Sequence, residues 1–167
     1  MRTMRSSGDT GATSSDYRTV RRSSEPFHYP TNVAHSPDGD IYVADGYGNA
    51  RIHKFDPKGR LLLSWGEPGD RAGQFRVPHG IAVDQSGTVY VADLENSRIQ
   101  LFSPEGEFLH EWTDAARPCQ VAFDGEGAMF IAELGYRARM WPRTSRPTRD
   151  ATGGRVSVID VHGTLWA

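Results

Sequence analysis

The sequence predicts an all-β fold built from propeller blades, each of them a four-stranded antiparallel sheet, and three observations support this prediction. The segment 77–112 can be laid over the segment 29–65 almost residue for residue, with an offset of 48 at Pro30 and Pro78 and of 47 at Trp65 and Trp112. Self-similarity with a period in the forties indicates a repeat architecture. The segments between the turns are short, rich in β-branched and aromatic residues, and free of helical periodicity. Eighteen glycines and ten prolines suit many short strands joined by turns.

The first repeat contains four predicted strands, at 33–36, 41–45, 51–56 and 61–65. The segments that separate them, SPDGD, GYGN and DPKG, supply the Gly, Asp and Pro residues that tight turns require. The second repeat reproduces this order with IAVD, TVYVAD, RIQLFS and EFLHEW. Four antiparallel strands in a repeat of this length are typical of a propeller blade rather than of a helical solenoid.

A third repeat is interrupted. It begins at Arg117 with RPCQVAFDGEGAMFIAEL and resumes at Arg155 with RVSVIDVHGTLW, after an insertion of about 17 residues. The predicted organisation is therefore a disordered arm or remnant loop at 1–26 and a partial propeller at 27–167. Its blades are expected at about 29–66, 77–113 and 117–167, with the insertion at about 135–154, most of it a disordered surface loop.

Composition excludes several classes of function. The formal net charge is −2, which argues against a nucleic-acid-binding protein, although Arg18, Arg21 and Arg22 form a small basic patch. No apolar run approaches the length that spans a bilayer, so no membrane partner is expected. The first residues lack the apolar core of a secretory signal, and the compartment stays unassigned. The single cysteine, Cys119, excludes an intramolecular disulfide.

Three blades do not close a ring, because propellers have four to eight. The open blade faces are an expected assembly surface, so self-association is one expected partnership, and a peptide or small-molecule ligand is another. Either the chain is part of a longer protein or two copies complete the ring. We favour the first.

The motifs DGYGNARI and GQFRVPHGIAVD, together with the RPCQVAFD segment, carry a more specific resemblance. Over about 16–166 the sequence resembles NHL-repeat propellers, and among them the bacterial relatives of peptidyl-α-hydroxyglycine α-amidating lyase. The resemblance implies an NHL-type β-propeller that is incomplete, with about three blades of an expected six. It also implies zinc held by three histidines, calcium in full-length relatives, and cleavage of an N–Cα bond that leaves a peptide amide and glyoxylate.

The resemblance assigns three site residues. His79 of VPHGIAVD matches a zinc-binding histidine, Tyr47 of DGYGN an active-site tyrosine, and Arg98 of NSRI an active-site arginine. Their chemistry is suitable, because a neutral imidazole can ligate zinc, a tyrosine can exchange a proton, and a guanidinium can grip a carboxylate with two hydrogen bonds. Without the resemblance, Tyr47 would be a turn aromatic and Arg98 a solvated cation at a strand start. The remaining histidines are expected to be surface or strand residues: His28, His35, His53, His110 and His162.

The chain also departs from the family pattern. The positions equivalent to His79 are Thr31 and Cys119, so two of the three expected zinc histidines are missing. Because a catalytic zinc usually needs three protein ligands, the chain alone is expected to be inactive. A non-catalytic binding module is the alternative. A sugar-lactone hydrolase is weaker, because it needs acidic and amide ligands at these positions.

Overall fold

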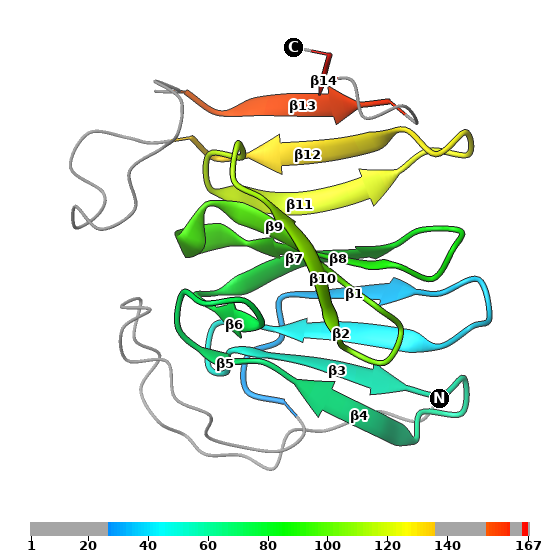
Figure 1. Ribbon diagram of the computed structural model, residues 1–167. Coiled ribbons are helices and arrows are strands. Elements are labelled where there is room, and N and C mark those ends of the chain that lie inside the picture. Colours follow the sequence, from blue (N-terminus) through cyan, green and yellow to red (C-terminus); the bar gives the residue numbers. More distant parts are fainter. Residues whose placement is uncertain (1–26, 136–152, 161–164, 167) are drawn as a thin grey trace.

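The computed structural model describes residues 27–135, 153–160 and 165–166, and these residues confirm the predicted all-β class. They form three four-stranded antiparallel sheets stacked side by side (Figure 1). The predicted arm at 1–26 and residues 136–152 of the predicted insertion lie outside the described residues. No helix in the described part of the chain is long and apolar enough to cross a membrane.

The strand bounds are close to those predicted. The first sheet contains β1 (Asn32–His35), β2 (Ile41–Asp45), β3 (Arg51–Phe55) and β4 (Leu61–Trp65). The second contains β7 (Pro78–Val83), β8 (Val89–Asp93), β9 (Arg98–Phe102) and β10 (Phe108–Trp112). The third contains β11 (Pro118–Phe123), β12 (Met129–Glu133), β13 (Arg155–Ile159) and β14 (Leu165–Trp166). The insertion of the third repeat therefore falls between β12 and β13, which pair directly from Glu133 and Arg155 onward.

The segment between the first two blades is more regular than predicted. Two short strands, β5 (Glu67–Pro68) and β6 (Gln74–Phe75), pair in parallel within it. A short 3₁₀ helix, η2 (Leu94–Asn96), follows β8 and ends at Ser97, which adopts the left-handed conformation.

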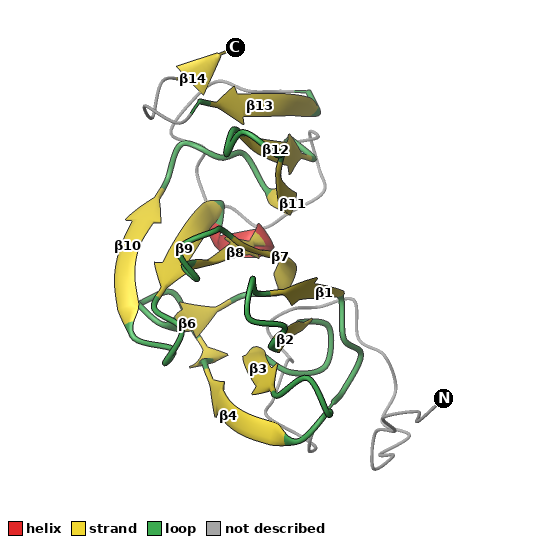
Figure 2. Cartoon of the chain, turned by 90° about the vertical axis from the view of Figure 1, so that its right-hand side faces the viewer, coloured by secondary structure: helices red, strands yellow, loops and turns green. Residues whose placement is uncertain are grey.

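The three sheets radiate as propeller blades do. Figure 2 shows β1, β7 and β11 together on the inner side of the arc, with β4 and β10 on the outer side. Strand β7 lies between β1 and β11, and the Asn32 side chain donates a hydrogen bond to the Gln120 side chain across it. Gly80 allows this close approach, since a Cβ there would lie 2.7 Å from the Gln120 Cα. The inner strands therefore converge on one side of the molecule.

Each blade packs on the next through the residues of alternating strand positions. The first junction buries Tyr42, Ala44 and Ile52 of the first blade against Ile81, Val89, Val91 and Phe102 of the second. The second junction buries Ala82, Ala92 and Ile99 against Val121, Met129 and Ile131 of the third blade. Trp65 packs on the first cluster and Trp112 on the second. Burial of the apolar surface of these two clusters holds the blades together, and a third core cluster, Phe27, Val43 and Phe55, lies on the other side of the first blade.

An acidic residue ends the second strand of every blade and fastens the segment that leads into that blade. Asp45, Asp93 and Glu133 each accept a hydrogen bond from a backbone N–H that lies 17 residues earlier in the chain. The three donors are His28, Arg76 and Ala116. Because the same contact recurs in all three blades, it fixes the start of each inner strand in the same place.

Candidate functional site

The start of each inner strand has an unusual backbone. Tyr29, Val77 and Arg117 have φ angles of 63°, 61° and 52°, and each directly precedes a proline. A positive φ is rare for a residue other than glycine, and for a β-branched residue such as Val77 it is strained. The neighbouring chain stabilises these conformations, because their carbonyls accept hydrogen bonds from the loop after the second strand.

A β-bulge follows at His79. The β7–β8 register shifts between Pro78 and Gly80, and the β11–β12 register shifts at the equivalent place, between Pro118 and Gln120. His79 and Cys119 are the residues skipped in these shifts. A bulge leaves its extra residue unpaired and redirects its side chain. The bulge therefore turns the His79 side chain out of the regular alternation of β7.

Two contacts define the state of His79. Its Nδ1 lies 2.7 Å from the carbonyl oxygen of Cys119 in the next blade, and its Nε2 lies 3.1 Å from the Tyr47 hydroxyl in the preceding blade. A carbonyl oxygen only accepts hydrogen bonds, so Nδ1 carries the proton. In the neutral ring, Nε2 then has a lone pair and the Tyr47 hydroxyl donates to it. A backbone carbonyl that fixes the tautomer in this way also orients the metal-ligating histidines of known metal sites.

Close packing of two loops brings Tyr47 to His79. Gly46 lies so near the next blade that a Cβ there would be 2.2 Å from the Pro78 carbonyl oxygen. Glycine at 46 therefore lets the β2–β3 loop approach the start of β7. The Tyr47 and His79 rings meet edge to face, with their centroids 5.5 Å apart, and the Tyr47 side chain is half exposed. The structure thus brings together two of the three residues that the sequence predicted.

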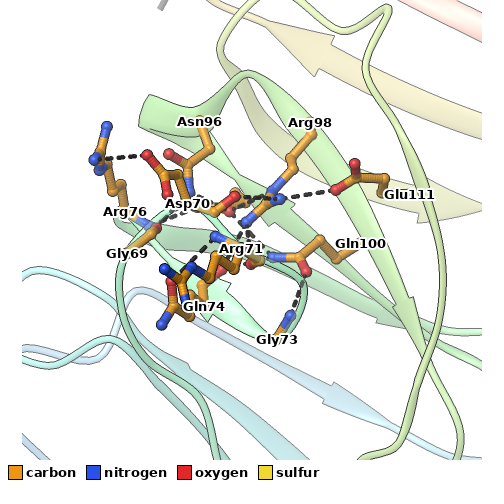
Figure 3. A network of polar contacts seen from close by, with 11 residues as sticks. Gly69, Asp70, Arg71, Gly73, Gln74, Arg76, Asn96, Arg98, Gln100 and Glu111 are labelled. Atoms are coloured by element: carbon orange, nitrogen blue, oxygen red, sulfur yellow. Dashed lines mark hydrogen bonds and ion pairs between the residues drawn. The ribbon is translucent and has the colours of Figure 1, made fainter. Parts of the chain in front are cut away.

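Arg98 lies elsewhere, in a buried polar network (Figure 3). Its Nε donates to Asp93 at 2.9 Å, and one terminal nitrogen donates to Glu111 at 2.8 Å and to the Asp70 carbonyl at 3.0 Å. The other terminal nitrogen donates to the backbone carbonyls of Arg71 and Gln74. A guanidinium has five N–H donors, and these five contacts use all of them.

Arg98 is therefore not the solvated strand-start cation expected without the resemblance. It is buried and joins β9 to the segment between the first two blades. Its role as an active-site arginine rests on the resemblance alone. The site residues therefore divide into a pair that meets, His79 and Tyr47, and a buried arginine that holds the fold.

Asp93 is the centre of this network, and sequence reasoning missed it. Burial raises the pKa of the Asp93 carboxyl to about 6, while the Arg98 guanidinium and the Asn96 amide act in the opposite direction. The Gln100 amide also donates to it at 3.1 Å. A signal was present in the sequence, because each repeat pairs an acidic residue in strand register with an arginine: Asp45 with Arg51, Asp93 with Arg98, and Glu133 with Arg155.

The second junction carries a different pair at its loop. Arg117, at the start of the third blade, donates to Glu95 of the preceding blade at 2.8 Å, and both side chains are buried. Cys119 occupies the position equivalent to His79, and its Sγ–H donates to the Ala132 carbonyl. Burial raises the pKa of the Cys119 thiol, so the thiolate that metal ligation requires is disfavoured there.

The described residues do not fit the zinc that the resemblance implies. No group of three His, Cys, Asp or Glu side chains within 27–135 and 153–160 is arranged to hold a metal ion. His79 has the fixed tautomer of a ligand but has no partner ligands among these residues. His53, by contrast, is a buried strand residue whose Nδ1 lies 2.7 Å from the Ser64 hydroxyl. His162 lies outside the described residues.

Comparison with known proteins identifies the type of repeat and the fold of the chain. The NHL repeat model matches residues 27–55 and 75–102. The chain aligns with the structure of streptogramin B lyase at a TM-score of 0.57 and 17% identity, covering 84% of this chain and 40% of that one. It aligns with luciferin-regenerating enzyme at 0.59 and 19%, covering 82% and 46%. These two likenesses show the fold alone. The chain therefore contains two NHL repeats, and its three blades have the fold of part of a β-propeller.

Proteins of similar sequence add a more specific resemblance. The chain is 45% identical over 92 residues to peptidyl-glycine α-amidating monooxygenase B of Xenopus laevis, covering 51% of this chain and 10% of that protein. It is 43% identical over 96 residues to peptidyl-α-hydroxyglycine α-amidating lyase 1 of Drosophila melanogaster, covering 52% and 18%. It is 35% identical over 115 residues to human NHL repeat-containing protein 3, covering 65% and 33%. The resemblance to amidating lyases is thus confirmed, and the chain spans a third or less of each relative.

Proposed function

We propose that the chain belongs to a lyase of the amidating type, which releases a peptide amide and glyoxylate from a C-terminal α-hydroxyglycine. The observation that carries this proposal is the His79–Tyr47 pair at the start of β7. The Cys119 carbonyl holds Nε2 of His79 as the unprotonated nitrogen, and the Tyr47 hydroxyl lies 3.1 Å from it. Such a pair can hold or move a proton beside a bound ligand. The similarity to amidating lyases supports the substrate class.

The zinc of this proposal needs further ligands. His79 would supply one through Nε2, and the others would come from residues beyond those described. When bound, zinc polarises an oxygen or acidifies a water molecule. With one histidine in place of three, the isolated chain is expected to release no glyoxylate, and calcium is proposed only for longer relatives.

The test measures glyoxylate release from a small N-acyl α-hydroxyglycine by the purified chain with added zinc. We expect no release by the chain alone, together with weak zinc binding in calorimetry that His79→Ala abolishes. His35→Ala is the matched control, because His35 is an exposed histidine at the end of another inner strand, β1. Release at the rate of a complete enzyme would show that the site is whole. Zinc binding that is equal in both variants would remove His79 from the proposal.

A non-catalytic binding module is the second candidate, and one observation favours it. Thr31, at the position equivalent to His79, donates its hydroxyl to the Pro78 carbonyl of the next blade at 2.8 Å. His79 makes a similar contact with the Cys119 carbonyl of the next blade. A role in linking neighbouring blades is therefore sufficient to explain a polar residue at this position. Peptide binding that depends on Tyr47 but is unaffected by zinc and by His79→Ala would favour this candidate.

A further inference from the structure

The two residues that come just before the Pro78–His79 pair are bound to the end of β8 and to the loop after it. The N–H of Arg76 donates to the Asp93 carboxylate at 2.8 Å. The carbonyls of Arg76 and Val77 accept hydrogen bonds from the backbone of the loop after β8, at 3.0 and 3.1 Å. The approach of the chain to His79 is therefore fixed by the second blade itself.

These contacts maintain a conformation that Val77 does not favour. Val77 is β-branched and buried, and its φ of 61° is strained for such a residue, so its surroundings must maintain it. Pro78 follows with no N–H to pair, and the β-bulge at His79 comes next. The direction in which the His79 side chain leaves β7 therefore depends on how Arg76 and Val77 are held.

Arg98 extends this hold to the rest of the segment between the first two blades. It donates to three backbone carbonyls within residues 70–74, and the Gln100 amide binds backbone groups of the same segment (Figure 3). Both side chains also donate to Asp93, at 2.9 and 3.1 Å. The carboxylate, the guanidinium and the amide are all buried. They form one polar unit that fastens the segment along its length.

The segment that leads into the third blade is held less extensively by its arginine. Arg155 stands where Arg98 stands in the second blade, and among the described residues it donates to one backbone carbonyl, that of Asp114. Its side chain is 33% exposed, whereas that of Arg98 is 6% exposed. The inner strand that follows has Cys119 where β7 has His79. The more extensive hold thus lies before the histidine.

His79 needs a precise position because it bonds to both neighbouring blades. Its Nδ1 lies 2.7 Å from the Cys119 carbonyl oxygen of the third blade, and its Nε2 lies 3.1 Å from the Tyr47 hydroxyl of the first. A ring displaced by about an ångström would lose at least one of these hydrogen bonds. The carbonyl contact decides which nitrogen carries the proton, so its loss would allow the other tautomer.

We propose that Asp93 and Arg98 are positioning residues for His79, which keep its Nδ1 protonated and its Nε2 free to accept a proton or to bind a metal ion. Arg98 thus acts on the site through the segment before β7 and does not touch the substrate. The inference rests on the proposed function only for the use that is made of His79. The positioning itself concerns the chain without zinc or substrate.

The first test determines the His79 tautomer by ¹⁵N NMR of the 167-residue chain without metal, at about pH 8, where imidazole side chains are mostly neutral. The signal that disappears in His79→Ala assigns the resonance. We expect the Nδ1–H form alone in the wild type and a mixture of tautomers in Asp93→Asn, because a carboxamide presents an NH₂ group to some of the donors around Asp93. Asn96→Ala removes one neutral donor from Asp93 and should give a smaller fraction of the Nε2–H form.

Met129→Ala is the matched control. Met129 is a buried core residue at the end of β12 that pairs with Phe123, whereas Pro118, next to Cys119, pairs with the opposite end. The substitution should lower the unfolding midpoint and leave the tautomer unchanged. An unchanged tautomer in Asp93→Asn and Asn96→Ala chains that keep their β-sheet circular dichroism would overturn the proposal. A wild type with the proton on Nε2, or a mixture in Met129→Ala as well, would also overturn it.

The second test measures zinc binding by calorimetry. If His79 is a zinc ligand, Asp93→Asn should weaken the binding at least about 10-fold, as the loss of groups that orient a ligand does in known metal sites. A tautomer that responds to Asp93→Asn in a chain that binds no zinc would contradict the zinc of the proposed function and support the positioning role. Zinc binding of equal strength in the wild type and Asp93→Asn would count against the positioning role.

Discussion

The two junctions between blades share one frame and differ at their inner loops. At the first junction, the loop after β2 presents Tyr47 to His79, and the contact is a half-exposed hydrogen bond. At the second, the loop after β8 presents Glu95 to Arg117, and the contact is a buried ion pair. The apolar faces beneath the loops are equivalent in both. The difference indicates that the second pair is a buried link between two blades, whereas the first pair stays partly exposed to solvent.

The ion pair of the second junction should give the largest effect on stability. Glu95→Leu leaves Arg117 buried without its carboxylate, and breaking a buried pair on one side costs about 3–5 kcal/mol. Urea unfolding monitored by circular dichroism measures this loss. Arg60→Met is the control, because the Arg60–Asp56 pair is exposed to solvent and its loss should change the free energy of unfolding far less. Similar losses in the two variants would contradict the distinction between the junctions.

The tryptophans test whether both junctions depend on packing to the same extent. Trp65 contacts Tyr42 of its own blade and Phe102 across the first junction, and Trp112 contacts Tyr90 at the second. Replacing either tryptophan by Ala should cost about 3 kcal/mol in thermal or urea unfolding. Trp65→Phe should cost far less, because its indole N–H is buried with no hydrogen-bond partner among the described residues. A thermal midpoint unchanged by both alanine variants would show that the two tryptophans do not stabilise the blade junctions.

A tyrosine at the same repeat position reports the charge at each junction. Burial raises the pKa of Tyr42, but Lys54 beside it acts in the opposite direction. Burial and the Asp84 carboxylate together raise the pKa of Tyr90 to about 12. A raised pKa favours the protonated folded form, so the stability that Tyr90 contributes is intact below pH 10 and falls as the pH rises toward 12.

Unfolding measured between pH 9 and pH 12 should therefore be less pH-dependent in Tyr90→Phe than in the wild type. Tyr42→Phe is the matched variant and should change the slope less. Equal slopes in the two variants would mean that Asp84 and Lys54 do not distinguish the junctions. The comparison uses the slope alone, since both substitutions also remove a hydroxyl from a packed face.

The smallest effect is expected at the first junction. His79→Ala should leave the β-sheet circular dichroism unchanged and cost about 1 kcal/mol, the value of a single hydrogen bond to Cys119. Tyr47→Phe should cost less, because the side chain is half exposed. A loss of sheet signal in His79→Ala would show that His79 holds the fold as Glu95 and Arg117 do.

The repeat made the fold predictable, and side-chain partners were harder to anticipate. Two predicted strands of the first blade, 41–45 and 61–65, match the structure, and the other two differ by one residue at their ends. The parallel pair β5–β6 was missed because its four residues carry no strand pattern, and it depends on how the chain crosses between blades. The meeting of Tyr47 with His79 follows from the family motifs. The burial of Arg98 depends on backbone carbonyls of residues 70–74, which no residue pattern reveals.

The acid that ends each second strand has a consequence for folding during synthesis. Its hydrogen bond reaches back only 17 residues, so each blade start can be fastened before the following blade has left the ribosome. Contacts close in sequence form quickly, because little chain entropy is lost in closing a short loop. A growing chain can thus add finished blades one at a time, as other repeat proteins do. Loss or duplication of a whole repeat would leave this hydrogen bond intact in each of the remaining blades.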